Sequence, residues 1–181
     1  TSRRSYAEPV RELLGELADV PAVIASSLKT PGRLSFRLQG HGPVSMLVMD
    51  CNEKLHLRGM AKSELAADAD AHINGVGDLL GDGRLVLTLQ PKTAETPYQS
   101  VVPLAGKTLA AIFEHFLEQS EQQPARLWLA ATPDTACGLF LQKLPNADVL
   151  DPDGWDRIEQ LAATVRPEEL QLAPEKLLNR L

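Results

Sequence analysis

The segment that decides the fold reads RLSFRLQGHGPVSMLVM and covers residues 33–49. Its first part alternates between polar and apolar residues, which is the period of a half-buried β-strand. The letters GHGP that follow combine glycine and proline and indicate a turn. The run from Val44 to Met49 is almost wholly apolar, which predicts a second strand covered on both faces. A third alternating strand, around Leu55, Leu57 and Gly59, completes an antiparallel meander.

Helical periodicity occurs on both sides of this meander. Residues 9–29 place apolar side chains on one helical face, and Pro21 inside the pattern is expected to kink the helix or split it in two. A second helix over 108–120 has a broad apolar stripe, with glutamates such as Glu114 on a face that we interpret as solvated. Further strands are expected around residues 85–89, 98–104, 126–131 and 138–144. The pattern predicts an α+β fold of layered antiparallel β-sheets with packed helices, followed by a short helical segment.

The composition excludes several classes of function. The chain has 181 residues, of which 44% are hydrophobic and 23% charged, so it is long enough to bury one substantial core. Its net charge of −6 lacks the positive excess that nonspecific binding to nucleic acid requires. We find no run of roughly 20 apolar residues for a membrane span and no leader-like opening segment. Two cysteines, Cys51 and Cys137, do not indicate a disulfide framework, and this low cysteine content is typical of a protein in a reducing cytoplasm. We interpret both as structural thiols.

A short motif raises the alternative of a nucleotide-binding enzyme. Gly106-Lys107-Thr108 follows a predicted strand and opens a predicted helix, as in a phosphate-binding loop. That loop requires a glycine where this chain has Val101, and Pro103 removes a backbone donor. We therefore interpret the motif as the start of a helix and keep the enzyme as an alternative hypothesis.

No other residues make a recognisable catalytic or metal site. The histidines lack cysteine or carboxylate neighbours at ligand spacing, so we predict no metal and no cofactor in this chain. They are His41, His56, His72 and His115. Gly75-Val76-Gly77 does not fit a dinucleotide-binding fingerprint and indicates a turn-rich loop. The sequence therefore favours a binding or structural role over an enzyme.

Several segments together carry a resemblance to a known family. The most specific are Tyr98-Gln99-Ser100-Val101-Val102-Pro103-Leu104 and Ser120-Glu121-Gln122-Gln123-Pro124-Ala125-Arg126. They occur in order with Arg58-Gly59-Met60-Ala61 and with the segments 81–89 and 138–145. From about residue 9 to its end, the chain resembles the heat-shock protein 33 family of redox-regulated bacterial holdase chaperones.

The resemblance implies a division of the chain and a mechanism. Residues 1–145 match the family's α+β chaperone core and residues 146–181 match its helical linker, so we expect a fragment of a longer protein that stops before the C-terminal zinc domain. In the family, four thiolates of that domain hold zinc. Oxidation forms disulfides, releases the metal and exposes client-binding surface. Cys51 and Cys137 do not match the ligand positions, so zinc is expected only in the missing domain.

The function implied by the resemblance is ATP-independent holding of unfolding or oxidatively damaged client proteins in the cytoplasm, without nucleic-acid or membrane partners. Family members also dimerise on activation, so a homodimer is an expected state. The candidate client contacts lie in the linker: Trp155, Ile158, Leu161, Leu170, Leu177 and Leu178. Two alternatives stay open. The stripe around Trp155 docks within the chain, or the chain is a passive scaffold and clients bind elsewhere.

Two local features complete these expectations. Asp151 as an N-cap and Pro152 at the first helical position indicate the start of the linker's first long helix. The methionines, Met46, Met49 and Met60, fall in neighbouring strands. We interpret them as core residues, with an adaptable binding surface as the alternative.

Overall fold

The computed structural model describes residues 5–27, 32–67, 75–92 and 96–181. A five-stranded sheet is formed by β1 (Gly32–Gly40), β2 (Val44–Cys51), β3 (Leu57–Ser63), β4 (Gly83–Pro91) and β5 (Tyr98–Pro103), in the order β3-β2-β1-β4-β5. A separate hairpin is formed by β6 (Ala125–Ala131) and β7 (Ala136–Gln142). Neighbouring strands of both sheets are antiparallel, which confirms the predicted meander and the α+β class.

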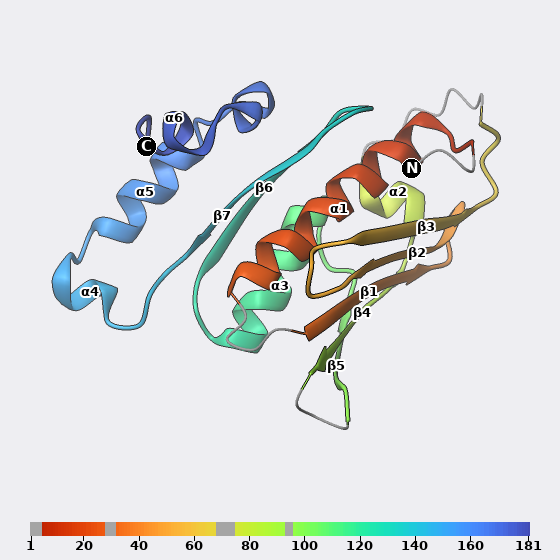
Figure 1. The fold of residues 1–181 in the computed structure, drawn as a ribbon, viewed down its shortest axis with the longest axis horizontal. Coiled ribbons are helices and arrows are strands. Elements are labelled where there is room, and N and C mark those ends of the chain that lie inside the picture. Colours follow the sequence, from red (N-terminus) through yellow and green to blue (C-terminus); the bar gives the residue numbers. More distant parts are fainter. Residues whose placement is uncertain (1–4, 28–31, 68–74, 93–95) are drawn as a thin grey trace.

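The helices cover these sheets in layers (Figure 1). Helices α1 (Glu8–Ser27) and α3 (Leu109–Glu121) lie between the five-stranded sheet and the hairpin, and the short α2 (Val76–Leu80) lies at one end of the sheet. The C-terminal segment, residues 146–181, lies on the far side of the hairpin. It contains α4 (Ala147–Leu150), α5 (Gly154–Ala162), a 3-10 turn η1 (Pro167–Gln171) and α6 (Pro174–Leu178).

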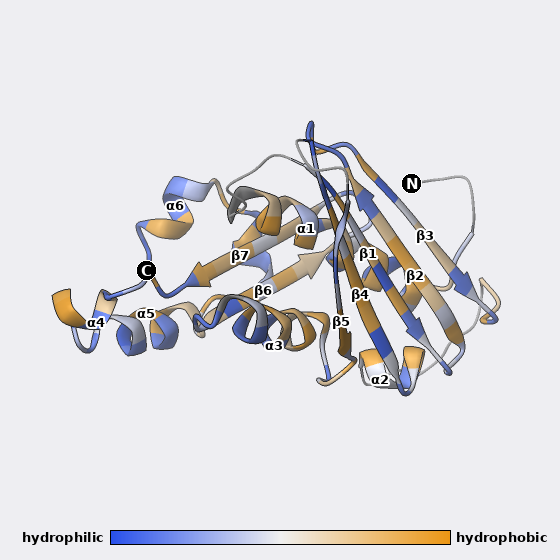
Figure 2. Cartoon of the chain, turned by 90° about the horizontal axis from the view of Figure 1, so that it is seen from below, coloured by the Kyte–Doolittle hydropathy of each residue, from blue (hydrophilic) through white to orange (hydrophobic). Residues whose placement is uncertain are grey.

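The main core lies between the five-stranded sheet and its covering helices. Hydrophobic and hydrophilic residues alternate along the strands (Figure 2), so that one face of each strand points to the helices. On the central strand β1 this face consists of Leu34, Phe36 and Leu38, all buried. Phe36 meets Phe113 of α3 edge to face, with ring centroids 5.3 Å apart. Apolar alternation thus fixes which face of the sheet receives α3.

Helix α3 forms where its apolar stripe was predicted. The stripe residues Leu109, Ile112, Phe113, Phe116 and Leu117 are all buried. The hydroxyl of Thr108 accepts a hydrogen bond from the backbone N–H of Ala111 at 3.1 Å, which satisfies a donor at the helix N-terminus. The interpretation of the motif before it as a helix start is therefore confirmed.

Of the two outcomes expected at Pro21, a kink or a split, the split does not occur. Helix α1 runs as one element from Glu8 to Ser27 with Pro21 inside it. Val20 and Ile24 on either side of the proline are buried. We attribute the continuity to this packing, which offsets the cost of the missing N–H. The expected end of this helix, including Leu28, lies outside the described residues.

The expected burial of the second strand and the expected start of the third strand need correction. Strand β2 is buried on one face only, because no described element covers the side that carries Met46 and Val48. Strand β3 begins at Leu57, and Leu55 precedes it in a left-handed conformation with φ 58°. Ala61 is the one buried residue of β3. The strand is exposed because it forms the edge of the sheet.

Two local assignments also differ from expectation. The segment around Gly75 forms the short helix α2 instead of a turn-rich loop, and the N–H of Val76 donates to the carbonyl of Lys107 at 3.0 Å. Helix α5 begins at Gly154, so Asp151 is not its N-cap and the proline after it is not its first residue. The Asp151 carboxylate instead pairs with Arg157 one turn into the helix.

Candidate binding surfaces

The C-terminal segment packs on the outer face of the hairpin through a second apolar cluster. Its buried members are Leu139, Ala162, Val165, Leu170 and Leu177, and the hairpin residues Trp128, Cys137 and Leu141 pack against them. Residues from the hairpin and from 146–181 therefore share one small core. The division of the chain at 145 and 146 stays a prediction from the family resemblance.

Arg126 of β6 joins the C-terminal segment to the main core. Its guanidinium pairs with Glu159 of α5 (Nε to Oε1, 2.6 Å) and with Glu118 of α3 (Nη1 to Oε1, 2.8 Å). Beside it, the N–H of Leu127 donates to the Glu114 carboxylate at 2.7 Å. Burial raises the pKa of Glu114, although this hydrogen bond opposes the rise. Glu114 is therefore a half-buried structural acceptor, and its expected place on a solvated face is wrong.

The six candidate client contacts do not form one surface. Leu170 and Leu177 are buried in the cluster against the hairpin, whereas Trp155 and Ile158 are half-buried. Leu161 and Leu178 are 44% and 59% exposed. The first pair thus has an internal packing role, and the last pair is free to meet another protein. That any of these residues binds clients stays a prediction.

Among the described residues, the most exposed large apolar side chains lie just before α5, where the sequence pattern predicted no surface. Leu144, Val149 and Leu150 are 70%, 81% and 90% exposed, and α4 buries none of its residues. The only local signal is the apolar pair Val149-Leu150, which stands between Asp148 and Asp151. It was too short for periodicity to reveal an unpacked helix.

A second exposed surface is the outer face of the five-stranded sheet, which points away from α1 and α3. Strand register places one residue of each strand in a row across it: Met60, Val48, Arg37, Val86 and Val101. Met60 is 40% exposed and Val101 is 56% exposed, both on edge strands. Of the other methionines, Met49 is buried on the inner face and Met46 is half-buried on the outer face. The core interpretation therefore holds fully only for Met49.

The glycine-lysine-threonine motif forms the turn and the N-terminal cap that begin α3. Gly106 has φ 146°, and a Cβ there would approach the backbone nitrogen of Ile112 to 3.2 Å, so the turn requires glycine. The Thr108 hydroxyl caps α3, and the Lys107 carbonyl accepts from the N–H of Val76. These contacts give Gly106 and Thr108 structural roles, whereas Lys107 contributes its backbone carbonyl.

The thiols likewise have structural surroundings. Cys51 is buried and Cys137 is half-buried, and both are free thiols. Burial raises the pKa of each thiol, and the charge of Asp19 adds to the rise at Cys137. Among the described residues no group of three or more His, Cys, Asp or Glu side chains could hold a metal ion. His72 lies outside the described residues.

An acidic contact between α1 and the hairpin was also missed. Asp19 faces β7, because a Cβ added at Gly138 would lie 3.6 Å from the Cβ of Asp19. The buried Oδ2 of Asp19 has no hydrogen-bond partner among the described residues. Burial, and then the charge of Glu16, raises the pKa of Asp19 to about 7. Burial, and then the charge of Glu12, raises the pKa of Glu16 to about 7. Sequence periodicity gives no sign of this contact, because it depends on which side of α1 receives the hairpin.

None of the described helices has both the length and the apolar composition that crossing a lipid bilayer requires.

Comparison with known proteins agrees with this architecture. A family model described as Hsp33 protein matches residues 1–181. Relatives named 33 kDa chaperonin are 38% identical over 97% of this chain in Methylobacillus flagellatus and 42% identical over 99% in Shewanella baltica. The chain spans 60% and 62% of those two proteins.

A solved structure shows the same fold. The crystal structure of the 33 kDa chaperonin (heat shock protein 33 homolog) from Thermotoga maritima aligns with a TM-score of 0.78 at 21% identity. The alignment covers 97% of this chain and 63% of that one. Together with the family match over the whole sequence, these likenesses show that the chain belongs to the Hsp33 family.

Proposed function

We propose that this chain is a client-holding part of a chaperone, which binds unfolding proteins without ATP and prevents their aggregation. The observation that carries the proposal is the group of exposed apolar side chains at 144–178, above all Val149 and Leu150. Exposed apolar patches mark interaction surfaces, because burying them against a partner removes apolar area from water. The names of the relatives support the same role.

The structure favours passive holding over a nucleotide-driven cycle. The residues of the glycine-lysine-threonine motif are engaged in capping α3 and in the contact with α2. Holding needs only an apolar surface that competes with client self-association. Tight binding of a magnesium–nucleotide complex would favour the alternative enzyme.

Zinc does not fit the described residues of this chain. The raised pKa of both cysteines disfavours the thiolates that zinc binds, and the described residues contain no cluster of ligands for it. We therefore route no step of client binding through the metal. For the complete protein we infer control by oxidation in a zinc domain outside this chain, cytoplasmic action and homodimer formation, as the family resemblance implies.

The test follows the light scattering of a heat-unfolding client without ATP, in reducing and in oxidising buffer. We expect suppression in both, because the exposed apolar residues are present in either condition. Replacing Val149 and Leu150 together by serine should raise the concentration for half-maximal suppression about threefold, since these side chains are 81% and 90% exposed and so can meet a client. Trp155→Ser with Ile158→Ser should have a similar effect.

Leu55→Ser is the matched control, because Leu55 is also exposed but lies at a turn before β3, away from the C-terminal segment. It should suppress as well as the parent chain. Circular dichroism checks that each variant remains folded. Failure of the parent chain to suppress in either buffer would leave the passive scaffold as the better description. Unchanged suppression by both folded double variants would remove the C-terminal segment from the proposal.

A further inference from the structure

The outer face of the five-stranded sheet carries the opposite charge to the rest of the molecule. Its cations come from β1, β3 and β4 and are Arg33, Arg37, Arg58, Lys62 and Arg84, whereas Asp50 is the one acidic residue that the described strands place on it. The whole chain has a net charge of −6. The positive charge of this face therefore differs in sign from the net charge of the chain. A local cationic face of this kind favours binding of an anionic group.

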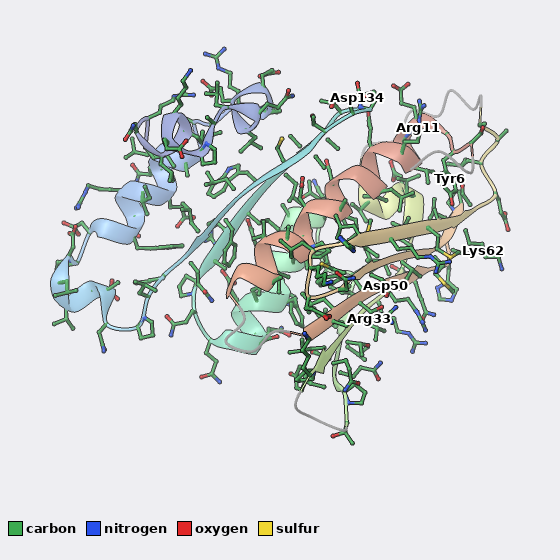
Figure 3. The ribbon with its side chains drawn as sticks, in the orientation of Figure 1. Tyr6, Arg11, Arg33, Asp50, Lys62 and Asp134 are labelled. Atoms are coloured by element: carbon green, nitrogen blue, oxygen red, sulfur yellow. The ribbon has the colours of Figure 1, made fainter. Side chains whose placement is uncertain are left out.

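Some of these cations are engaged within the face and others are not. Arg33 pairs with Asp50 at 3.1 Å, and these two side chains lie together in Figure 3. The Nε–H of Arg84 donates to the side-chain oxygen of Gln39 at 3.0 Å. Arg37, Arg58 and Lys62 form no ion pair with any described residue. Arg58 lies opposite Asp50 in the strand register, whereas Arg37 and Lys62 lie opposite Val48 and Met46, so their charges are not neutralised within the described part of the face.

Arg37 has the most informative position of the three. It lies at the centre of the row across the sheet, directly between Val48 of β2 and Val86 of β4, and the edge positions of the row are Met60 and Val101. An exposed guanidinium flanked on both sides by apolar side chains complements a carboxylate that is itself flanked by apolar groups. No described element covers this row, because α1 and α3 pack on the other face (Figure 2).

The length of the row sets the size of the ligand. Five strands about 4.8 Å apart give a row of about 19 Å, which an extended segment of about six residues would span at about 3.3 Å per residue. A long polyanion such as nucleic acid fits less well, because the row is mostly apolar and the surrounding protein is acidic.

We propose that the outer face of the sheet binds extended client segments of about six residues in which a carboxylate is flanked by apolar side chains. The proposal rests on the proposed chaperone function and adds a client class and a second contact surface to it. Arg37 provides the charge selection, and the apolar residues of the row provide the area that any unfolded segment would bury.

The test measures fluorescence anisotropy of three labelled seven-residue peptides made of leucine and valine around a central glutamate, glutamine or lysine. The glutamate peptide should bind about fivefold more tightly than the glutamine peptide, as expected for one exposed charge pair, and the lysine peptide should bind most weakly. The glutamate preference should shrink at high salt concentration.

Arg37→Gln should abolish the difference between the glutamate and glutamine peptides and leave glutamine binding unchanged, while Arg37→Lys should retain part of the preference. Arg11→Gln is the matched control, since Arg11 is an exposed arginine on α1, away from this face (Figure 3). Because Arg37 is exposed, these changes should leave the fold intact.

Equal affinity for the glutamate and lysine peptides, or an unchanged preference in Arg37→Gln, would overturn this inference. So would competition by a short oligonucleotide at lower concentrations than the acidic peptide, or a monomer–dimer equilibrium that Arg37→Gln abolishes. Client aggregation measured in parallel separates the two proposals. Suppression without charge preference would contradict the acidic client class and leave the chaperone function standing, whereas absence of suppression would contradict the function itself.

Discussion

The hairpin and the five-stranded sheet differ in what covers the face that points away from α1 and α3. Each turns one face to α1 and α3 and the other face away from them. The far face of the hairpin is apolar, with Trp128, Leu139 and Leu141, and the C-terminal segment covers it. The far face of the sheet mixes apolar residues with cations, and no described element covers it. An apolar face requires a permanent cover, whereas a mixed face remains soluble and keeps apolar area available for a partner.

Removing the cover tests this contrast most strongly. Leu170→Ala should weaken the docking of the C-terminal segment by about 2–3 kcal/mol, because it leaves a cavity in a small cluster. Hydrogen exchange should show faster exchange in 167–178 with little change in the five-stranded sheet. Val101→Ala on the outer face should change stability by no more than about 0.5 kcal/mol, because Val101 is more than half exposed. Similar effects of the two substitutions would contradict the distinction between a covered and an open face.

The ion pairs of the hairpin should contribute more to stability than the ion pair on the outer face of the five-stranded sheet. Arg126→Gln should destabilise the chain by about 1–2 kcal/mol in urea unfolding, because its guanidinium serves two carboxylates from α3 and α5 in a partly buried position. Arg33→Gln removes an exposed pair with Asp50 and should cost less than about 0.5 kcal/mol. A larger loss for Arg33→Gln would show that the outer face of the sheet depends on its charges for stability rather than for binding.

The sequence predicted what depends on local spacing. The buried face of β1 and the stripe of α3 follow from periods of two and of about 3.6, which neighbouring residues reveal. The start of α5 was misplaced because Asp151 and Asp153 have the same capping chemistry, and local sequence does not decide between them. The split expected at Pro21 does not occur, because the lost N–H of proline is a local cost that the sequence shows, whereas the packing around Pro21 is tertiary.

The candidate surfaces depend on pairings that are distant in sequence. Arg37 lies between Val48 and Val86 only because β1 pairs with both β2 and β4. Likewise, Leu170 and Leu178 have the same apolar character in the sequence, and their different burial arises from docking on the hairpin. Sequence pattern therefore supplied the candidate residue types, and strand order was needed to tell a packing residue from an exposed one.

The smallest expected effect concerns the two sides of α1, which faces the sheet with apolar residues and the hairpin with Asp19. Because the folded pKa of Asp19 is about 7, above its ordinary value of 3.8, folding favours the protonated carboxyl. Its contribution is fully present below about pH 4 and is lost as the pH rises through about 7. Asp19→Asn should therefore raise the free energy of unfolding at pH 8 by about 1 kcal/mol, a value reduced for partial solvent access, and have little effect at pH 4.

Urea midpoints at pH 4, 6 and 8 measure this dependence, and Asp134→Asn in the exposed turn between β6 and β7 is the control that should not alter it. Glu16, whose pKa is also about 7, retains its own part of the dependence in the Asp19→Asn variant. The slope should thus be reduced rather than abolished, and a second substitution, Glu16→Gln, should remove most of the remainder. An unchanged slope in the double variant would mean that α1 meets the hairpin without an energetic cost from these carboxyls. The contact on the hairpin side of α1 would then be no more sensitive to pH than the apolar contact on the sheet side.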